Sequence, residues 1–205
     1  MAASSRYRAL GRRLARLKKH HLAFKPRLAG NYTVRQLSQA AAYTVFAHGE
    51  FEDFIEDWAL EILNRIHSKG HGPGASPMLA HLFAHRKEIP FPTQLPLPAN
   101  SRNWQTLFGE VIGVHRGVID NSHGIRADHI CKMLVPLGVD LAVIDQLTMS
   151  ELDSFASIRG SHAHKSMRAH LGQQFDPFDR AAKVNNIYGL LLPLDECLQA
   201  HLAAC

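Results

Sequence analysis

The chain has 205 residues, of which 46% are hydrophobic, and its formal net charge is +5. This length and composition suffice for one substantial hydrophobic core, so we expect one main domain. No apolar run reaches the length needed to cross a bilayer, and the N-terminus lacks the apolar segment of a secretory signal, so we expect a cytoplasmic protein with no membrane contact. The three cysteines form no C-x-x-C pair, which argues against a disulfide framework and a cysteine-based zinc site.

The charge is unevenly distributed along the chain. Residues 1–49 contain ten Lys or Arg and no Asp or Glu, whereas the remainder has a balance of −5. Between Arg6 and Lys19, apolar residues recur at helical spacing, which predicts a basic amphipathic helix. We therefore expect a basic arm over residues 1–30 and a helical domain over residues 31–205. The cations that we expect to bind RNA phosphates are Arg12, Arg13, Arg16, Lys18 and Lys19.

Two other interpretations of this arm are open. In the first, the helix packs its leucine stripe on the core and its cations are simply solvated. In the second, the arginine-rich and acid-free segment is a transit peptide of mitochondrial type.

The clearest periodicity begins after this arm. From residue 34 to residue 68, apolar residues follow in steps of three and four, which predicts one helix about 50 Å long. Thr33 and Gln36 form a capping-box pattern at its start. His48 falls in the apolar stripe and is predicted to be a hydrogen-bonded core residue. Glu52 lies beside the stripe, where it is either an exposed carboxylate or a group that orients Arg159.

The middle of the chain offers one pattern that can bind a metal. The segment from Pro77 to Lys87 predicts a helix, in which His81 and His85 have the i, i+4 spacing of a metal clip. No third ligand lies nearby, so we expect no metal and no other cofactor. The four prolines in residues 89–100 predict an extended surface loop.

The remaining segments are also predicted to be helical, so the fold class is all-α, a bundle around the helix of residues 34–68. No alternating strand pattern appears in the sequence. The predicted elements are a helix from Ser101 to Asn121, two short helices around Pro136-Leu137-Gly138 with Asp140 capping the second, and a final helix from Phe178 to Leu202, capped by Asp176 and kinked at Pro193.

The residues of greatest chemical interest are Arg159-Gly160-Ser161-His162-Ala163-His164. Arg presents a planar fork of donors that matches a phosphate, and His exchanges protons near neutral pH. Ser150 and Asp153 form a capping-box pattern that predicts the start of the preceding helix. On an unbroken helix, Arg159 and His164 would lie roughly 140° apart, so we expect the backbone to bend at Gly160. The alternative is a set of solvated residues at a helix end.

Three features together resemble the HEPN superfamily, especially its RiboL-PSP-type members. They are the R-x4-H pattern from Arg159 to His164, the leucine-rich helical hairpin from Ile130 to Leu147 with its Leu137-Gly138-Val139 break, and the helical segment 47–56. The resemblance covers roughly residues 33–203. Two positions depart from the family: Gly160 stands where a polar residue is common, and Ser166 stands where some two-component toxins carry a modified Tyr.

The resemblance implies a metal-independent endoribonuclease of toxin or phage-defence type, with the RNA 2′-hydroxyl as nucleophile. It implies that His164 moves the proton and that Arg159 stabilises charge on the phosphate oxygens. Ser161 would hydrogen-bond a phosphate, and His162 would order the motif or face solvent. The sequence has no Walker loop, no G-x-S-x-G elbow and no two-metal carboxylate cluster, which disfavours ATP-driven and metal-driven chemistry.

The resemblance also implies partners. It implies a two-fold homodimer whose R-x4-H motifs face one cleft, RNA as substrate, and an antitoxin or inhibitor protein. Two rival interpretations are open, namely a non-catalytic HEPN-like module that binds RNA or a protein, and a His-rich metal protein.

Overall fold

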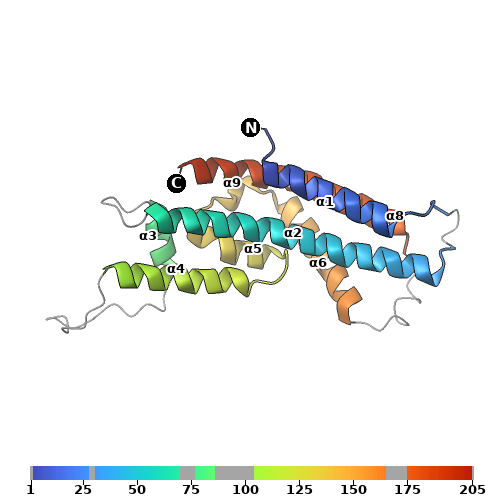
Figure 1. Ribbon diagram of the computed structural model, residues 1–205, viewed down its shortest axis with the longest axis horizontal. Helices are drawn as coiled ribbons and strands as arrows, with labels where there is room; N and C mark the ends of the chain where they lie inside the picture. Colours follow the sequence, from blue (N-terminus) through green and yellow to red (C-terminus); the bar gives the residue numbers. More distant parts are fainter. Residues whose placement is uncertain (1, 28–30, 70–76, 86–103, 165–174, 205) are drawn as a thin grey trace. The chain divides into compact units, whose positions relative to one another are not determined.

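The structure is a computed structural model that describes residues 2–27, 31–69, 77–85, 104–164 and 175–204, without the side chains of residues 77–80, 104–106 and 160–164. All regular elements in these ranges are helical, which confirms the all-α prediction (Figure 1). They are α1 (Ser5–His21), α2 (Val34–Lys69), α3 (Pro77–Ala84), α4 (Trp104–Asp120), α5 (Ala127–Leu134), η2 (Val135–Leu137), η3 (Leu141–Val143), α6 (Gln146–His164), α8 (Pro177–Leu190) and α9 (Leu192–Ala204). Among them, none is long and apolar enough to cross a membrane.

The chain divides into two compact units. Unit 1 comprises Met1–Ile55, Gly124–Ala127 and Ala142–Glu196, and unit 2 comprises Glu56–His123, Asp128–Leu141 and Cys197–Cys205. The helix α2 contributes its first part to unit 1 and its second part to unit 2. The basic N-terminal helix belongs to unit 1, so the boundary expected at residue 30 is not a boundary between these units.

The long helix α2 begins where the capping-box pattern predicts. The Thr33 hydroxyl accepts a hydrogen bond from the Gln36 backbone N–H at 3.3 Å, and the Gln36 side-chain oxygen accepts one from the Thr33 N–H at 3.0 Å. These bonds satisfy two N–H groups that the start of a helix leaves without partners. The helix then runs for 36 residues, so the prediction of one long helix is confirmed.

In unit 1, α1 packs its apolar stripe into the core. Tyr7, Leu10 and Leu14 are buried, and the Tyr7 ring stacks on Tyr188 of α8 at 4.3 Å between centroids. The Tyr7 hydroxyl donates to the Tyr188 carbonyl at 2.7 Å, and the Tyr188 hydroxyl donates to the Tyr7 carbonyl at 3.3 Å. The amphipathic helix is therefore confirmed, and its leucine stripe packs on the core.

The start of α1 is fixed by a buried carboxylate. Ser4 caps the helix, because its hydroxyl accepts a hydrogen bond from the Tyr7 N–H at 2.9 Å. The Asp195 side chain, which is completely buried, accepts from the Ser4 N–H at 2.8 Å and from the Ser4 hydroxyl at 2.6 Å. Since a buried carboxylate without hydrogen bonds is costly, this pairing ties α1 to α9 within unit 1.

Unit 2 is held together by α4. The buried His115 places Nε2 2.9 Å from the Met133 carbonyl of α5, and Arg116 donates to the Asn64 side chain of α2 at 2.6 Å. The helix α3 packs on η2. After η2 the chain turns at Gly138, whose φ of 82° is a left-handed conformation that favours glycine.

Several local predictions need correction. The helix before the R-x4-H motif begins at Gln146 and not at Ser150, because the Asp145 carboxylate accepts a hydrogen bond from the Thr148 N–H at 2.6 Å. Asp153 instead accepts from the Ala127 N–H at 2.8 Å, which ties α6 to the start of α5.

The two other helix predictions between η2 and the C-terminus were partly right. The second short helix after Gly138 is only the single turn η3, since α6 starts soon after it. The predicted final helix is divided into α8 and α9 at Leu191, and Pro193 lies in the first turn of α9, where proline is tolerated. The cap by Asp176 is confirmed, because its carboxylate accepts from the Phe178 N–H at 2.7 Å. The predicted loop at residues 89–100 and the cap at Ser101 lie outside the described residues.

The contact between α1 and α8 predicts an unusual effect of a glycine substitution. A Cβ added at Gly11 would lie 2.6 Å from the Tyr188 hydroxyl oxygen and 2.9 Å from its Cζ. Because Tyr188 is stacked on Tyr7, we expect Gly11→Ala to lower the free energy of unfolding by about 1–2 kcal/mol. Alanine would otherwise stabilise a helix by about 1 kcal/mol over glycine. Urea unfolding measures the difference.

Gly113→Ala in the exposed face of α4 is the matched control, since no described atom beyond its own helix lies within 4 Å of an added Cβ. This variant should be neutral or slightly more stable than the parent. Equal stabilisation by the two substitutions would contradict the packing described for Gly11.

Candidate functional site

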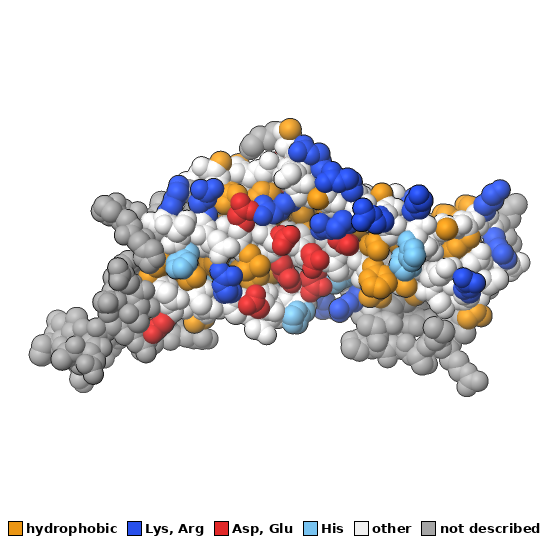
Figure 2. Space-filling view, viewed as in Figure 1, with side chains coloured by type: hydrophobic (Ala, Val, Ile, Leu, Met, Phe, Trp, Pro, Cys, Tyr) orange, Lys and Arg blue, Asp and Glu red, His pale blue; other side chains and the backbone are white. Residues whose placement is uncertain are grey.

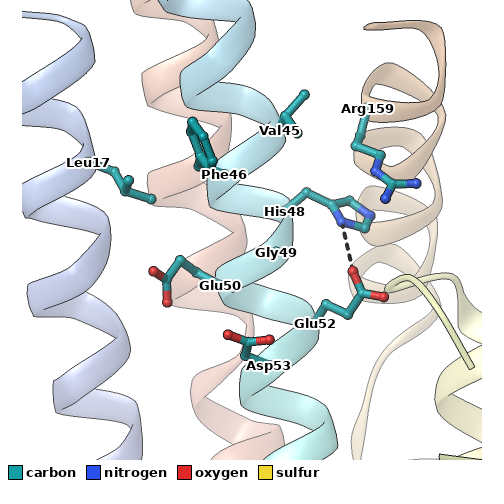
Figure 3. A pocket seen from close by; sticks show the side chains of 9 residues that line it. All are labelled: Leu17, Val45, Phe46, His48, Gly49, Glu50, Glu52, Asp53 and Arg159. Carbon is teal, nitrogen blue, oxygen red and sulfur yellow. Dashed lines mark ion pairs between the residues drawn. The ribbon is translucent and has the colours of Figure 1, made fainter. Parts of the chain in front are cut away.

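A pocket in unit 1 brings Arg159 of α6 together with one face of α2 (Figure 3). The pocket has a volume of about 350 Å³, which falls within the usual range for small-ligand sites. Its walls are formed by Leu17 of α1, by Arg159, and by Val45, Phe46, His48, Gly49, Glu50, Glu52 and Asp53 of α2. Because residues three and four apart share a face of a helix, α2 presents an imidazole and a carboxylate side by side here.

His48 is the buried member of this group. Only 2% of its surface is exposed, and its ring lies against the Phe155 ring of α6 at 6.1 Å and 24°. Its Nδ1 atom has no hydrogen-bond partner among the described residues and lies 3.6 Å from Glu52 Oε2, just beyond hydrogen-bond length. The predicted burial of His48 is confirmed, whereas the predicted hydrogen bond is not found at Nδ1.

The environment of His48 keeps its imidazole neutral. Burial, and secondarily the positive charge of Arg159, lower the pKa of His48 from 6.5 to about 4. At pH 7 the side chain is therefore uncharged, so one ring nitrogen donates a hydrogen bond and the other accepts one. The Arg159 guanidinium therefore lies close enough to His48 to disfavour a positive charge on its ring.

The three carboxylates of the pocket have different surroundings. Glu50 forms an ion pair with Arg13 of α1, so Arg13, which we expected to bind RNA, already has a partner within the chain. Asp53 is exposed to solvent. The Glu52 side chain is only 15% exposed and lies beside His48, which makes it the most shielded carboxylate opposite Arg159. The exposed-carboxylate interpretation of Glu52 is therefore wrong.

The helix α6 carries Arg159 without a break. It is a single helix from Gln146 to His164 and continues through Gly160, so the helix does not end at the motif, whereas the expected bend at Gly160 stays a prediction. A glycine inside a helix costs only about 1 kcal/mol, which the surrounding helical hydrogen bonds can offset. On such a helix, positions 159 and 164 lie roughly 140° apart around the axis. The side chains of Ser161, His162 and His164 lie outside the description.

Unit 1 has a strongly basic surface over α1. Figure 2 shows Lys and Arg side chains in a row there, with Asp and Glu side chains next to them. The exposed cations of α1 include four of the five that we expected to bind RNA, namely Arg12, Arg16, Lys18 and Lys19. A second pocket of unit 1, near the start of α2, is lined by two more arginines, Arg27 and Arg35.

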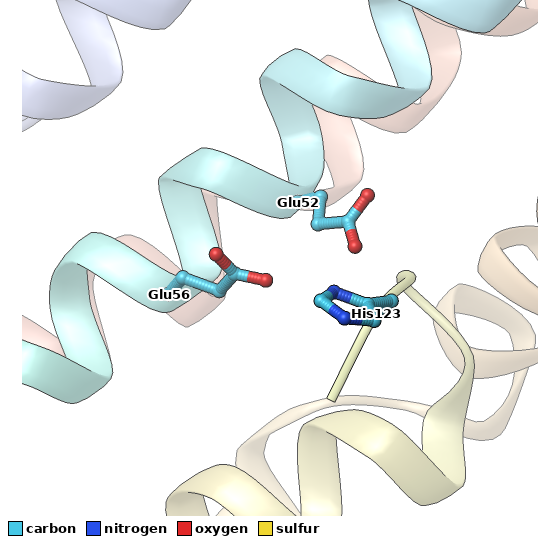
Figure 4. A group of neighbouring side chains, drawn as sticks. All are labelled: Glu52, Glu56 and His123. Carbon is cyan, nitrogen blue, oxygen red and sulfur yellow. The ribbon is translucent and has the colours of Figure 1, made fainter. Parts of the chain in front are cut away.

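Unit 2 contains two groups of side chains with metal-ligand chemistry. The rings of His81 and His85 are stacked at 6.4 Å, and His85 Nδ1 lies 3.0 Å from the His81 carbonyl. Glu56 and His123 have ligand atoms within 4.8 Å of one another, and Glu52 precedes Glu56 by one turn of α2 (Figure 4). Sequence reasoning missed Glu56 and His123 because they are far apart in the chain and follow no motif.

The lowered pKa of His48 predicts a pH dependence of stability. The unfolded chain takes up a proton at His48 near pH 6.5, whereas the folded protein does so only near pH 4. The contribution of His48 to the free energy of unfolding is therefore fully present above pH 6.5. It is lost progressively as the pH falls toward 4, and the loss reaches about 3 kcal/mol. We expect His48→Asn, which cannot titrate, to lose less stability over this window than the parent. Urea unfolding at a series of pH values measures the difference, and parallel curves would show that His48 titrates normally.

Comparisons with known proteins supply no relative for this chain. No protein-family model, no curated protein sequence and no solved structure matches it.

Proposed function

We propose that this chain is a metal-independent endoribonuclease of HEPN type in which Arg159 binds the scissile phosphate. The observation that carries the proposal is the pocket that puts Arg159 opposite the neutral His48 and the shielded carboxylate of Glu52. A guanidinium is a permanent cation that matches a phosphate, and a nearby carboxylate or imidazole can move a proton. These are the group types that phosphodiester cleavage by an internal hydroxyl requires.

In the proposed reaction, the RNA 2′-hydroxyl attacks the adjacent phosphorus. Arg159 offsets the charge that develops on the phosphate oxygens, and His164 donates a proton to the leaving 5′-oxygen. DNA lacks the attacking hydroxyl, so the substrate is RNA. A toxin or phage-defence role in the cytoplasm, and control by an antitoxin or inhibitor protein, follow from the family resemblance alone.

The continuous helix α6 favours a site composed of two chains. On one continuous helix, positions 159 and 164 lie about 140° apart around the axis, so we do not expect both residues of one chain to reach the same phosphate. In a two-fold homodimer, a second copy of α6 can supply His164 to the pocket that contains Arg159. We therefore propose a homodimer in which each site takes its arginine from one protomer and its histidine from the partner.

RNA would reach this site along the basic surface of unit 1. The exposed cations Arg12, Arg16, Lys18 and Lys19 lie on α1, which also contributes Leu17 to the wall of the pocket. Contacts with the RNA backbone release counterions, so binding through these side chains would weaken with salt.

A non-catalytic module that binds RNA or a protein is the second candidate, and one observation favours it. Glu52 and Asp53 line the same pocket as Arg159, and like charges near a phosphate oppose its binding. In that case RNA would lie on α1 alone and would remain intact.

Cleavage of RNA in the presence of EDTA distinguishes the two candidates. We expect the parent protein to cut RNA without a metal, and Arg159→Ala to lower the single-turnover rate by about 100–1,000-fold, as removal of a group that stabilises the transition state does. Arg126→Ala is the control, since Arg126 is an exposed arginine of unit 1 that does not line the pocket. Intact RNA with stoichiometric parent protein would support the binding module and contradict the nuclease.

A further inference from the structure

We infer that Glu52 is the group that takes the proton from the RNA 2′-hydroxyl and that His48 is the residue that positions it. This inference rests on the proposed function and adds to it a proton acceptor, which belongs to the same chain as Arg159. The R-x4-H motif then supplies only the phosphate-binding arginine and the proton donor.

The pocket favours Glu52 over the other carboxylates. Glu50 is occupied by its ion pair with Arg13, and Asp53 is exposed to solvent. Glu52 is shielded but still reaches the surface of the pocket, with 15% of its side chain exposed. In Figure 3 its carboxylate points toward the His48 ring and lies below the Arg159 guanidinium in this view. A general base must lie within hydrogen-bond reach of the hydroxyl that it deprotonates.

His48 is placed to hold this carboxylate in one orientation. The two residues are one turn apart on α2, and His48 Nδ1 lies 3.6 Å from Glu52 Oε2. The ring itself is fixed by its contact with Phe155. A buried N–H without a partner costs about 1–3 kcal/mol, so a small movement that lets Nδ1–H donate to Glu52 is favourable. We assign the Nδ1–H tautomer on this ground.

A neutral histidine suits this role better than a charged one. Its Nδ1–H can donate a hydrogen bond to Glu52 without adding a second positive charge beside Arg159. The charged groups around the pair include Arg159 from α6, Asp53 and Glu50 from α2, and Arg13 from α1, and a Glu56 carboxylate oxygen one turn further along α2 lies within 4.8 Å of a Glu52 carboxylate oxygen. Burial, and secondarily the charge of Arg159, lower the pKa of His48 and keep the imidazole in the neutral form.

The proton transfers balance in this scheme. The O–H bond of the 2′-hydroxyl breaks and its proton moves to Glu52, while the 2′-oxygen forms a bond to phosphorus. The bond from phosphorus to the 5′-oxygen then breaks, and this oxygen takes a proton from the partner protomer's motif histidine. The products are a 2′,3′-cyclic phosphate and a 5′-hydroxyl, Glu52 returns its proton to water, and the histidine takes up a proton from water.

The decisive comparison is between two neighbouring carboxylates of the pocket. We expect Glu52→Gln to lower the single-turnover rate of RNA cleavage in EDTA by at least about 100-fold, with RNA affinity retained. Asp53→Asn makes the same change in charge one residue away and should alter the rate only a few-fold. If Glu52→Gln folds poorly, Glu52→Asp keeps the charge and retracts the oxygen atoms, and we expect it to cut more slowly than the parent.

Variants of His48 test the positioning role through rescue by a conservative substitution. In His48→Asn the amide N–H replaces Nδ1–H, so we expect a rate within about 10-fold of the parent, whereas His48→Leu loses the donor. Without a donor at this position Glu52 is no longer held in one orientation, so we expect His48→Leu to cut RNA much more slowly than His48→Asn. Equal rates in the two variants would overturn the positioning role.

The outcomes separate this inference from the proposed function. If the parent protein cuts RNA and Arg159→Ala does not, but Glu52→Gln retains the parent rate, the nuclease stands and the assignment of Glu52 is overturned. If the parent protein leaves RNA intact, both are overturned.

Discussion

The packing of Phe155 against α2 determines where Arg159 lies. The Phe155 ring is fully buried, meets Phe51 edge-on at 5.9 Å and lies against His48 at 6.1 Å. Arg159 follows Phe155 by four residues on α6, which is about one helical turn. It therefore lies at the edge of the contact between Phe155 and α2. The apolar core and the candidate site of unit 1 therefore depend on the same pair of helices.

This placement has an electrostatic consequence. The contact that buries His48 also brings it near a permanent cation, and both effects disfavour the imidazolium form. Burial is tolerated because a neutral imidazole has a far smaller desolvation cost than a charged one. A neutral histidine between a guanidinium and a carboxylate can donate a hydrogen bond without adding a second positive charge to the pocket.

Features encoded by neighbouring residues could be predicted from the sequence, and features that depend on tertiary contacts could not. The capping box of Thr33 and Gln36 involves residues three apart, and the apolar period of α2 repeats along one element. The start of α6 was misplaced because Asp145 competes for the capping role, and the helix continues through Gly160 because one glycine is a weak perturbation. The proximity of His48 to Arg159 has no local signal, since it arises only when α6 packs on α2.

The most direct test of this account is recovery of activity in mixed dimers. Arg159→Ala and His164→Ala proteins are refolded together, so that their chains exchange, and RNA cleavage is measured in EDTA. If each site takes its arginine from one protomer and its histidine from the partner, random mixing restores about a quarter of the parent's sites, because half of the dimers are mixed and each has one intact site. Activity of the mixture no higher than that of the separate variants would contradict the composite site.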